Sequence, residues 1–461
     1  MQVPKRDAGA DRPIVVTKSG NSDGAKGANH SAERSGQPMR EEPRRSGKSY
    51  EISKRSVWEA YKRVRANGGA AGVDGQSVAA FEVNLKDNLY KVWNRMSSGS
   101  YFPSPVRRVE IAKQSGGRRQ LGIPTVTDRI AQSVVKELLE REVEPIFHPS
   151  SFGARPGRSA HDALGKARKR CWEKDWVIDL DVQDFFGSLP HDLVMRAVRH
   201  HCSESWVHLY VERWLKAPIE EGTGVYRTPS KGTPQGGVVS PLLANLFMHY
   251  AFDVWMQGHA GHIEFERYLD DIVIHCSSEA EAEELLAAVR TRLLECGLVL
   301  HPDKTRIAYC KDVKRNKQYR STSFDFLGYT FRPRLSRNRW GKIFLSFTPA
   351  ISAKSANRIR KEIRSWSLPS RWAGRSLAEV AAYVNPRVRG WMNYYGRYRR
   401  SECKRILQHL NRVLVRWAAK KFKRFHRRKR KASRWLVSVA RRDPKLFDQW
   451  AAGVTPRAAG W

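Results

Sequence analysis

The spacing of apolar residues predicts a β-hairpin in the middle of the chain, made of two short strands at 263–268 and 272–276. Leu269, Asp270 and Asp271 lie at or beside its reversal. Neighbouring side chains along a strand point to opposite faces, whereas at a tight turn two consecutive carboxylates can converge on one cation. A solvated turn is the simpler interpretation of two aspartates alone, so the other segments decide between these interpretations.

A second strand pattern, at 176–182, alternates so that Asp179 and Asp181 share one face. Aspartate is disfavoured in strands, and two of them in an apolar segment indicate a site more than a surface. A third carboxylate is therefore available to join the hairpin pair. Asp181 is the favoured residue for this role, and Asp179 and Asp184 are the alternatives.

A glycine-containing segment, Thr233 to Gly237, precedes a predicted helix. Ser240 suits the N-cap and Pro241 the first helical position, and one apolar stripe follows. The stripe consists of Leu243, Leu246, Phe247, Tyr250 and Val254. The glycine pair Gly236-Gly237 lets a base or a sugar come close to the backbone.

The remaining patterns continue this alternation of elements. They predict a strand, a turn at Gly116-Gly117, a second strand and a helix within 103–132, then a helix at about 280–295 and strands at 299–304 and 324–331. Beyond about residue 333 the pattern becomes helical, with a helix at 377–384, a new helix capped by Asn385-Pro386, and an aromatic stripe at residues 391, 394, 395 and 398. Such a stripe is more often core than ligand contact.

Composition adds a strong charge bias to this picture. The 461 residues include 84 Lys or Arg and 46 Asp or Glu, which gives a formal charge of +38 and implies a polyanionic partner. No run approaches 18 uncharged apolar residues, so a membrane is not a predicted partner. The six cysteines show no CxxC spacing, which excludes a zinc ribbon and a disulfide framework. We expect a cytoplasmic protein that associates with the nucleoid.

Several blocks, in a fixed order, resemble group II intron-encoded reverse transcriptase/maturases of the bacterial type. These blocks are Asp181 with Phe185-Phe186 and His191, then TPQGGVVSPLLANL, Tyr268-Leu269-Asp270-Asp271, Leu300 to Thr305 and Phe326 to Tyr329. The chain departs from the pattern at Leu269, where the family usually has Ala, and at Gly187, where it usually has Asp.

The resemblance implies an α+β right-hand polymerase, with fingers and a palm built on an antiparallel sheet, followed by a helical thumb called maturase domain X. The expected organisation is a disordered basic tail (1–48), a helical extension of the fingers (49–100), fingers and palm (101–335), the thumb (336–440) and a C-terminal tail (441–461). The final residues show no paired cysteines and no HNH-like histidine cluster, so we expect no C-terminal endonuclease domain.

The same resemblance implies the site residues. Asp181, Val182, Asp270 and Asp271 would hold two Mg²⁺ ions, with Mn²⁺ as a substitute, and Lys304 would donate a proton to the departing pyrophosphate. Lys113 and Arg119 would hold the incoming triphosphate, with Arg118 as an alternative to Arg119. The remaining substrate contacts would come from Phe186, which would exclude a 2′-hydroxyl, and from Gln235 and Gly236.

RNA contacts are expected from two basic regions. Arg155 and Arg158 lie in a glycine-containing loop, for which a simple connector is the alternative interpretation. From Cys403 to Arg442 there are sixteen Lys or Arg and no Asp or Glu, a bias that favours phosphate contact over a merely solvated face. The predicted RNA-binding residues lie in this segment and in the few residues before Cys403: Arg397, Arg399, Arg400, Lys420, Lys421, Lys423 and Arg424.

The predicted function is therefore an RNA-directed DNA polymerase and maturase that binds its group II intron RNA, assists splicing and copies the intron into DNA during retrohoming. Its partners would be that RNA, a DNA target with its primer, and dNTPs, and a homodimer is compatible with the sequence. The alternatives are a non-catalytic RNA-binding splicing factor and a reverse transcriptase of another lineage, such as a retron enzyme.

Overall fold

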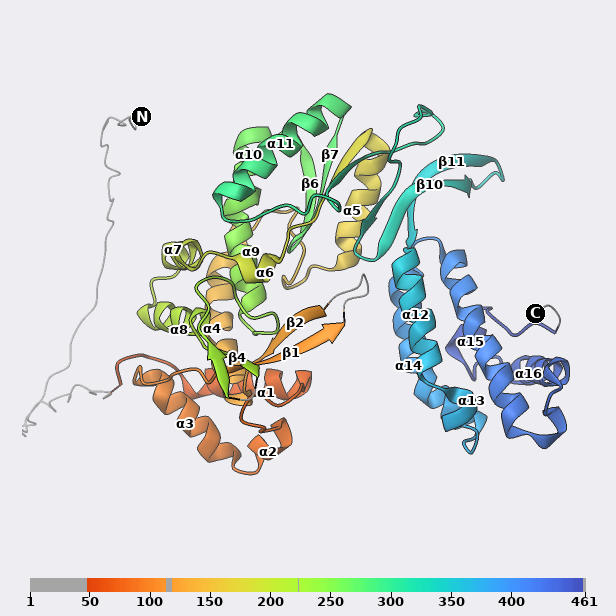
Figure 1. The fold of residues 1–461 in the computed structure, drawn as a ribbon, viewed down its shortest axis with the longest axis horizontal. Coiled ribbons are helices and arrows are strands. Elements are labelled where there is room, and N and C mark those ends of the chain that lie inside the picture. Colours follow the sequence, from red (N-terminus) through yellow and green to blue (C-terminus); the bar gives the residue numbers. More distant parts are fainter. Residues whose placement is uncertain (1–47, 113–117, 223, 459–461) are drawn as a thin grey trace, which may run out of the picture. The chain divides into compact units, whose positions relative to one another are not determined.

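The computed structural model describes residues 48–112, 118–222 and 224–458, which belong to one compact unit with three β-sheets (Figure 1). All strand pairs but one are antiparallel, and helices fill the rest of the unit, so the predicted α+β class is confirmed. The predicted tail lies outside the described residues except for Lys48. Within the described part, no helix combines the length and the apolar character needed to cross a bilayer.

The first described elements are helices: α1 (Lys54–Asn67), α2 (Val78–Glu82) and α3 (Leu85–Ser97). Ser53 and Ser77 cap the first two, because each side-chain oxygen accepts a hydrogen bond from a backbone N–H in the first turn. The apolar side of α1 packs against the long helix α4 (Val126–Val143), which is followed by the short 3₁₀ turn Glu144–Ile146.

The first sheet has the strand order β2-β1-β4-β5. Its strands are β1 (Val106–Ala112), β2 (Arg118–Ile123), β4 (Ile219–Gly222) and β5 (Val225–Arg227). The predicted hairpin within 103–132 is confirmed, because β1 and β2 pair antiparallel from Arg107 opposite Ile123 to Ala112 opposite Arg118.

The central sheet has the order β6-β7-β3-β8. Its strands are β6 (Glu264–Tyr268), β7 (Asp271–Cys276), β3 (Trp176–Leu180) and β8 (Arg306–Tyr309). The predicted strand at 299–304 is wrong in extent: Leu300 makes an isolated bridge with Val182, residues 302–304 turn, and the strand begins at Arg306. Pro302 has no N–H to offer a ladder, which explains the interruption.

Helices surround the central sheet: α5 (Ala160–Glu173), α6 (Phe185–Ser188), α7 (His191–His201), α8 (Ser205–Leu215), α9 (Ser240–Met248), α10 (Val254–Ala260) and α11 (Glu279–Glu295). Helix α9 begins one residue earlier than predicted, with Val239 as its N-cap. A π-helical turn, His249–Asp253, joins α9 to α10. The wider turn shifts the helical phase, so Val254, predicted in the apolar stripe, is 42% exposed.

The third sheet has the order β11-β10-β9, with β9 (Phe324–Phe326), β10 (Tyr329–Arg337) and β11 (Ile343–Ile351). The predicted strand at 324–331 is thus two strands. Leu327 and Gly328 connect them with φ of 48° and 78°, the positive pair that a type I′ turn requires. Strand β10 crosses residue 335, where the sequence places a domain boundary.

The C-terminal helices are α12 (Ala353–Ser365), α13 (Leu368–Arg371), α14 (Leu377–Tyr395), α15 (Arg400–Lys421), α16 (Lys429–Arg442) and α17 (Asp448–Ala451), with a 3₁₀ turn at Lys423–Phe425. The predicted break at Asn385-Pro386 is wrong, because α14 continues through Pro386. The Asn385 side chain instead binds the chain near α17, donating to the Leu446 carbonyl at 3.0 Å and accepting from the Asp448 N–H at 3.1 Å.

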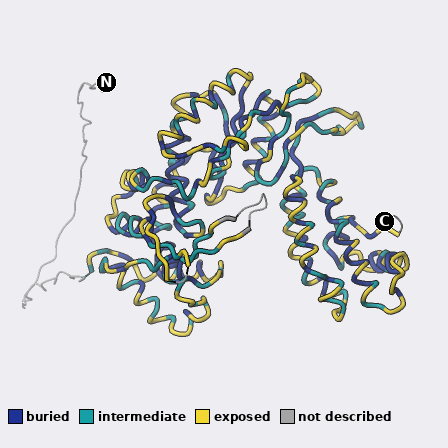
Figure 2. The backbone as a smooth tube through the Cα atoms, in the orientation of Figure 1, coloured by how far each residue is buried: buried dark blue, intermediate teal, exposed yellow. Residues whose placement is uncertain are grey.

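The buried residues form two hydrophobic clusters, visible as dark segments in Figure 2. One joins the N-terminal helices to the central sheet, and the other joins the third sheet to the C-terminal helices. Phe447, Trp450 and Val454 belong to the second cluster and are at most 2% exposed. The sequence predicts a tail from residue 441, but these three residues within its described part are packed into the core.

Candidate active site

The aspartate turn, by which we mean residues 268–271, connects β6 and β7. Tyr268 pairs with Asp271, so the chain reverses over Leu269 and Asp270. Leu269 has φ of 59°, in the left-handed region that glycine usually occupies at the first position of a type II′ turn. Gly153 lies directly against this turn, since a Cβ there would come within 2.6 Å of the Leu269 nitrogen. The predicted hairpin is confirmed, and its reversal is closely packed.

The register of the central sheet brings Asp181 beside this turn. Strands β3 and β7 are antiparallel, and their last pair is Leu180 with Ile272. Asp181 directly follows Leu180 and Asp271 directly precedes Ile272, so the two aspartates flank this last pair. The charge of Asp181 acts on the Asp271 carboxyl and raises its pKa, which agrees with their closeness. Asp181, Asp270 and Asp271, which are far apart in sequence, therefore gather at one end of the sheet.

Asp181 also contacts the turn that follows the Leu300 bridge. Its carbonyl accepts from the His301 N–H at 2.7 Å, and its own N–H donates to Thr305 Oγ1 at 3.3 Å. Lys304 Nζ lies 3.0 Å from Asp181 Oδ2. The structure thus brings the predicted lysine and the predicted carboxylate together as an ion pair.

The surroundings of Asp271 disfavour its charged form. Desolvation raises the pKa of Asp271 to about 7, and the charges of Asp270, Asp179 and Asp181 add to the rise. The residue keeps an exposed surface, so a ligand can reach it. A carboxyl group with such a pKa is partly protonated at neutral pH unless a nearby cation favours its charged form.

Asp179 and Asp184, the alternatives to Asp181, have other surroundings. Burial raises the pKa of Asp179 to about 7, although Arg306 opposes the rise through an ion pair of 3.1 Å. Asp184 has φ of 39° at the start of α6, and its carboxylate lies over Gly187, 2.3 Å from where a Cβ would be. Asp179 pairs with Val273, further from the aspartate turn, and Asp184 lies over α6, so Asp181 remains the favoured residue.

The donor chemistry of the site fits a hard divalent cation. Its side-chain donors are carboxylate oxygens, the ligands that Mg²⁺ and Mn²⁺ prefer. The Val182 side chain has no donor atom, so only the backbone carbonyl of this residue could serve as a ligand. Among the residues that the structure describes, no three Asp, Glu, His or Cys side chains already stand together as a metal-binding group. Asp181 would have to leave Lys304 at least in part to ligate a cation with the turn.

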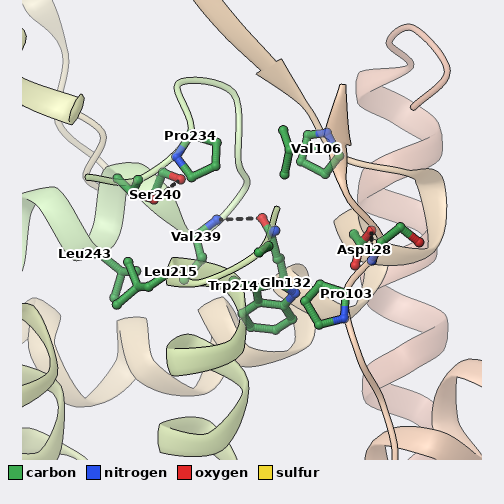
Figure 3. Close-up of a pocket in the computed structure, with 14 residues that line it drawn as sticks. Pro103, Val106, Asp128, Gln132, Trp214, Leu215, Pro234, Val239, Ser240 and Leu243 are labelled. Carbon is green, nitrogen blue, oxygen red and sulfur yellow. Dashed lines mark hydrogen bonds between the residues drawn. The ribbon is translucent and has the colours of Figure 1, made fainter. Parts of the chain in front are cut away.

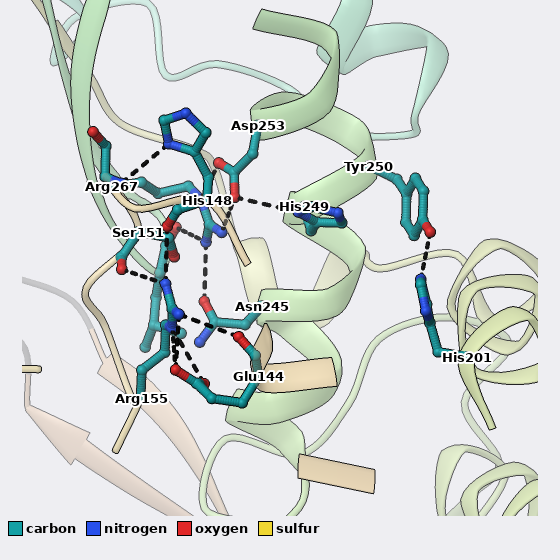
Figure 4. A network of polar contacts seen from close by, with 12 residues as sticks. Glu144, His148, Ser151, Arg155, His201, Asn245, His249, Tyr250, Asp253 and Arg267 are labelled. Carbon is teal, nitrogen blue, oxygen red and sulfur yellow. Dashed lines mark hydrogen bonds and ion pairs between the residues drawn. The ribbon is translucent and has the colours of Figure 1, made fainter. Parts of the chain in front are cut away.

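A buried network holds the aspartate turn from behind (Figure 4). The Arg267 guanidinium is fully buried and forms a two-point ion pair with Asp253, at 2.7 and 2.6 Å. It also donates to Asn245 Oδ1 at 3.0 Å and to the Leu269 carbonyl at 3.4 Å. Asn245 in turn donates to the Gly153 carbonyl at 2.6 Å. The π-helical turn is part of this support, because Asp253 is its last residue.

A second buried group braces the hairpin strands. Glu266 of β6 and His275 of β7 are diagonal neighbours on the two strands, and His275 Nε2 lies 2.6 Å from Glu266 Oε2. Arg170 of α5 pairs with Glu266 and donates to the Phe265 carbonyl at 2.6 Å. These buried polar contacts join β6 to β7 and both strands to α5.

Arg155, which was predicted to contact RNA, is buried and bonded within the protein. Its side chain is 8% exposed and donates to both Glu144 carboxylate oxygens, at 2.7 to 3.2 Å. It also donates to the carbonyls of His148 and Ser151, at 2.9 and 2.8 Å. Figure 4 shows the contacts of Arg155 with Glu144 and Ser151. Arg155 is thus a structural brace, whereas its neighbour Arg158 is exposed.

The glycine segment lies against β2. The Gln235 carbonyl accepts from the Gly122 N–H at 2.8 Å. Gly236 has φ of 120°, and a Cβ there would lie 2.4 Å from the Gly122 carbonyl oxygen. Gln132 Oε1 accepts from the N–H groups of Val238 and Val239, at 2.7 and 3.5 Å, and Figure 3 shows the second of these bonds. Only glycine fits this approach of loop to strand.

A cavity of ≈ 10 Å³ beside this loop has room for about one water (Figure 3). Asp128 lines it, and burial raises the pKa of this carboxyl. The Asp128 carboxylate accepts from the Thr125 hydroxyl at 2.6 Å and from the Ser104 N–H at 3.3 Å. The cavity is too small for a substrate, so we assign it no role in catalysis.

Phe186 is half-buried and packs edge-to-face on Phe185, with ring centroids 5.2 Å apart. Its carbonyl accepts from the Thr233 N–H at 2.7 Å, so the glycine segment and α6 are joined. Lys113, the first predicted triphosphate contact, lies outside the described residues. Arg119 is on β2 opposite Ile111, and Arg118 precedes it.

The predicted RNA-binding residues of the C-terminal helices differ in exposure. Lys420, Lys423 and Arg424 are exposed, as are Arg397 and Arg400. Two others have protein partners: Lys421 donates to the Ala373 carbonyl at 3.2 Å, and Arg399 donates to the Leu335 carbonyl at 2.6 Å.

The sequence predictions missed Arg267, Asp253 and Asn245, the residues that support the aspartate turn. For Asn245 and Asp253 a signal was present, because each is a polar residue in a largely apolar helical segment, where it needs a partner. Arg267 lies in the charged strand EFERY and gave no such signal. The sequence does not tell which polar residues pair with one another.

Two family models match the chain in succession. Residues 111–331 match the reverse transcriptase (RNA-dependent DNA polymerase) model, and residues 356–435 match the group II intron, maturase-specific domain. The aspartate turn and Asp181 lie in the first range, and the basic helices α14 and α15 lie in the second.

Curated relatives agree with these matches. The chain is 30% identical over 309 residues to Protein YkfC of Escherichia coli (strain K12), a match that covers 59% of this chain and 78% of YkfC. It is 34% identical over 193 residues to the group II intron-encoded protein LtrA of Lactococcus lactis subsp. cremoris, covering 41% of this chain and 32% of LtrA. A third relative, an uncharacterized 91 kDa protein in the cob intron of Schizosaccharomyces pombe, is 31% identical over 193 residues, or 41% of this chain and 23% of that protein.

The matches to LtrA and to the yeast protein thus span a third or less of those longer proteins. The order of the two domain models, the coverage of YkfC and the gathered aspartates all agree with one assignment. The chain belongs to the group II intron-encoded reverse transcriptase/maturase family.

Proposed function

We propose that this protein is an RNA-directed DNA polymerase and intron maturase, which binds its group II intron RNA, assists splicing and copies the intron into DNA during retrohoming. In this proposal the first sheet and the N-terminal helices are the fingers, the central sheet is the palm, and the C-terminal helices are the thumb. The observation that supports it is the register of β3 and β7, because Asp181 and Asp271 flank its last pair and Asp270 lies in the adjoining turn.

The carboxylates of Asp181, Asp270 and Asp271 and the Val182 carbonyl would hold two Mg²⁺ ions. When bound, such a pair lowers the pKa of an attacking hydroxyl and stabilises the charge that develops on the transferred phosphate. Desolvation and the neighbouring carboxylates together raise the pKa of Asp271, which supports this role, because a bound cation favours the charged form.

The other residues of the site would position substrate and move a proton. Lys304, which pairs with Asp181 at 3.0 Å, would donate a proton to the departing pyrophosphate. Phe186 would lie under the sugar of the incoming nucleotide, with Gln235 and Gly236 beside it. Lys113 and Arg119 would neutralise the triphosphate.

The C-terminal helices would bind intron RNA. Their exposed cations, among them Lys420, Lys423 and Arg424, lie in a region without any acidic residue from Cys403 to Arg442. The maturase-specific match over 356–435 favours this function over a retron-like enzyme.

Primer extension on an RNA template tests the polymerase function. Asp270→Asn with Asp271→Asn should abolish cDNA synthesis and leave RNA affinity unchanged, because the turn keeps its shape while the cation ligands lose their charge. Asp303→Asn is the matched control, since Asp303 is an exposed aspartate in the nearby turn. Full synthesis by the double variant would disprove the proposed site, and a wild-type protein that binds intron RNA but extends no primer would favour a non-catalytic splicing factor.

A further inference from the structure

The β10–β11 hairpin ends in an exposed apolar tip. Trp340 is 74% exposed at the end, and Leu335 and Ile343 behind it are 66% and 65% exposed. Leu335 pairs with Leu345, and Arg337 with Ile343, so these side chains share one face of the hairpin. Large apolar residues grouped in this way at a surface usually mark a contact with another molecule.

The tip is a defined turn that presents Trp340 from a fixed backbone. Asn338 Oδ1 accepts from the N–H groups of Trp340 and Lys342, at 3.0 and 2.9 Å. Gly341 has φ of 84° and donates to the Asn338 carbonyl at 3.1 Å, and Arg337 Nε donates to the Gly341 carbonyl at 3.1 Å. A preformed turn loses little conformational freedom when it binds, which favours affinity.

The charge around the tip identifies the kind of partner. Residues 326–351 contain no Asp or Glu, and their five cations are Arg332, Arg334, Arg337, Arg339 and Lys342. The Arg339 guanidinium lies 4.0 Å from the Trp340 ring centroid. Burial lowers the pKa of Arg334 to about 10, and the guanidinium groups of Arg332 and Arg399 add to this. Like charges held this close favour an anionic ligand.

We propose that the tip around Trp340 is a stacking platform for unpaired nucleobases, with Arg337, Arg339 and Lys342 neutralising the adjoining phosphates. Aromatic rings between cations are the usual composition of a surface that binds single-stranded nucleic acid. The proposal deepens the proposed function and rests on it for the source of the ligand, which is an unpaired stretch of either the RNA or the DNA strand. The tip lies between the residues that match the two family models, 111–331 and 356–435, so neither model includes it.

Equilibrium binding to short oligonucleotides tests the platform. The full chain is compared with Trp340→Ala and Trp340→Phe, using one unstructured sequence as single-stranded RNA, as single-stranded DNA and as a blunt duplex. Trp340→Ala should weaken binding to one or both single strands by about fivefold to a hundredfold, the range for loss of one base stack. Trp340→Phe should retain most of the affinity, and the duplex affinity should not change.

Salt dependence separates stacking from charge. A base stack releases no counterion, so Trp340→Ala should leave the slope of log affinity against log salt unchanged, while Arg339→Gln should make it shallower. Trp58→Ala is the control, since Trp58 is another exposed tryptophan, 43% accessible, on α1. Melting temperatures of all these variants should match the wild type, because Trp58, Arg339 and Trp340 are exposed.

Three results would overturn the platform: unchanged single-strand affinity in Trp340→Ala, an equal loss in Trp58→Ala, or a loss that includes the duplex. A changed sedimentation coefficient in Trp340→Ala would assign the tip to a second copy, and a loss of binding to anionic vesicles would assign it to a lipid surface. The Asp270→Asn, Asp271→Asn protein should bind oligonucleotides like wild type. The binding test of the tip can therefore be interpreted even if the protein proves to have no polymerase activity.

Discussion

Arg267 and Asp253 are two opposite charges buried against the aspartate turn, and neither has access to water. A buried ion pair contributes little net stability compared with apolar residues of the same size, because both charges lose their hydration. Removing one partner is costly for the same reason. The pair therefore fixes the position of the turn more than it stabilises the fold.

Asp253→Ala should lower the free energy of unfolding by about 3 to 5 kcal/mol, because it leaves the Arg267 guanidinium buried without its counter-charge. Urea denaturation measures this change. Arg405→Ala is the control: its partner Glu402 lies 3.2 Å away in an exposed pair, and loss of that pair should cost less than about 1 kcal/mol. Equal effects of the two substitutions would contradict a special role for the buried pair.

The raised pKa of Asp179 predicts a pH dependence of stability. The folded protein holds the Asp179 proton up to a pH of about 7, whereas the unfolded chain releases it near the ordinary value of 3.8. Folding therefore takes up a proton between these values, and the free energy of unfolding should fall as the pH rises from about 4 to about 7, by at most about 1.4 kcal/mol per pH unit for one group.

Asp179→Asn should flatten this part of the curve, since an amide does not titrate. Thermal denaturation of both proteins at a series of pH values, in a chelating buffer, gives the difference. A parallel pair of curves would show that Asp179 has an ordinary pKa in the folded protein.

At the scale of elements, the glycine segment depends on one close contact with β2. Gly236→Ala should destabilise the protein and reduce primer extension, because the new Cβ would lie 2.4 Å from the Gly122 carbonyl oxygen and φ is 120°. Gly258→Ala is the matched control in α10. Nothing lies within 4 Å of its added Cβ, so it should stabilise the protein by about 0.5 to 1 kcal/mol. Melting temperatures that shift in the same direction for both would contradict this account.

The elements also show what the sequence could and could not predict. The hairpin at 264–276 and helix α11 follow their apolar patterns closely: the hairpin strands are buried over most of their length, and α11 buries one stripe. The pattern gave a wrong prediction at a proline, a residue that can either begin a helix or lie within one. Pro386 suggested a helix start, yet burial of Val384 and Val388 keeps α14 continuous around it.

The candidate site shows a similar limit. The three aspartates were recognisable from their motifs, but Arg155 was assigned to RNA because a loop arginine beside glycines has no visible partner in the sequence. Its partner Glu144 lies eleven residues earlier, and only the folded loop brings them together. Long-range polar pairing of this kind has no local signal.

At the scale of the whole molecule, a formal charge of +38 should make intron RNA binding strongly salt-dependent. Replacing three exposed cations with glutamine should reduce the magnitude of the log-log slope by about 2, from about 0.7 for each lost phosphate contact. The changes are Lys420→Gln, Lys423→Gln and Arg424→Gln. Filter binding at several salt concentrations gives the slope.

The control for this experiment removes three cations that carboxylates already neutralise. Each of them forms an ion pair with a glutamate on the same helix: Lys62 with Glu59, Lys169 with Glu173, and Lys216 with Glu212. Their replacement by glutamine should leave the slope nearly unchanged. Equal reductions in both triple variants would show that net charge alone, and not the C-terminal surface, sets the affinity.

The segment after α16 packs against the C-terminal helices and is hydrogen-bonded to two of them, α14 and α15. Asn385 fastens this segment at one end, and Asn411 fastens it at the other by donating to the Val454 carbonyl at 2.8 Å. The maturase-specific match stops at residue 435, well before this segment. A protein shortened to that limit would expose the apolar surface now covered by Phe447 and Trp450, so the folding unit is longer than the region of recognisable similarity.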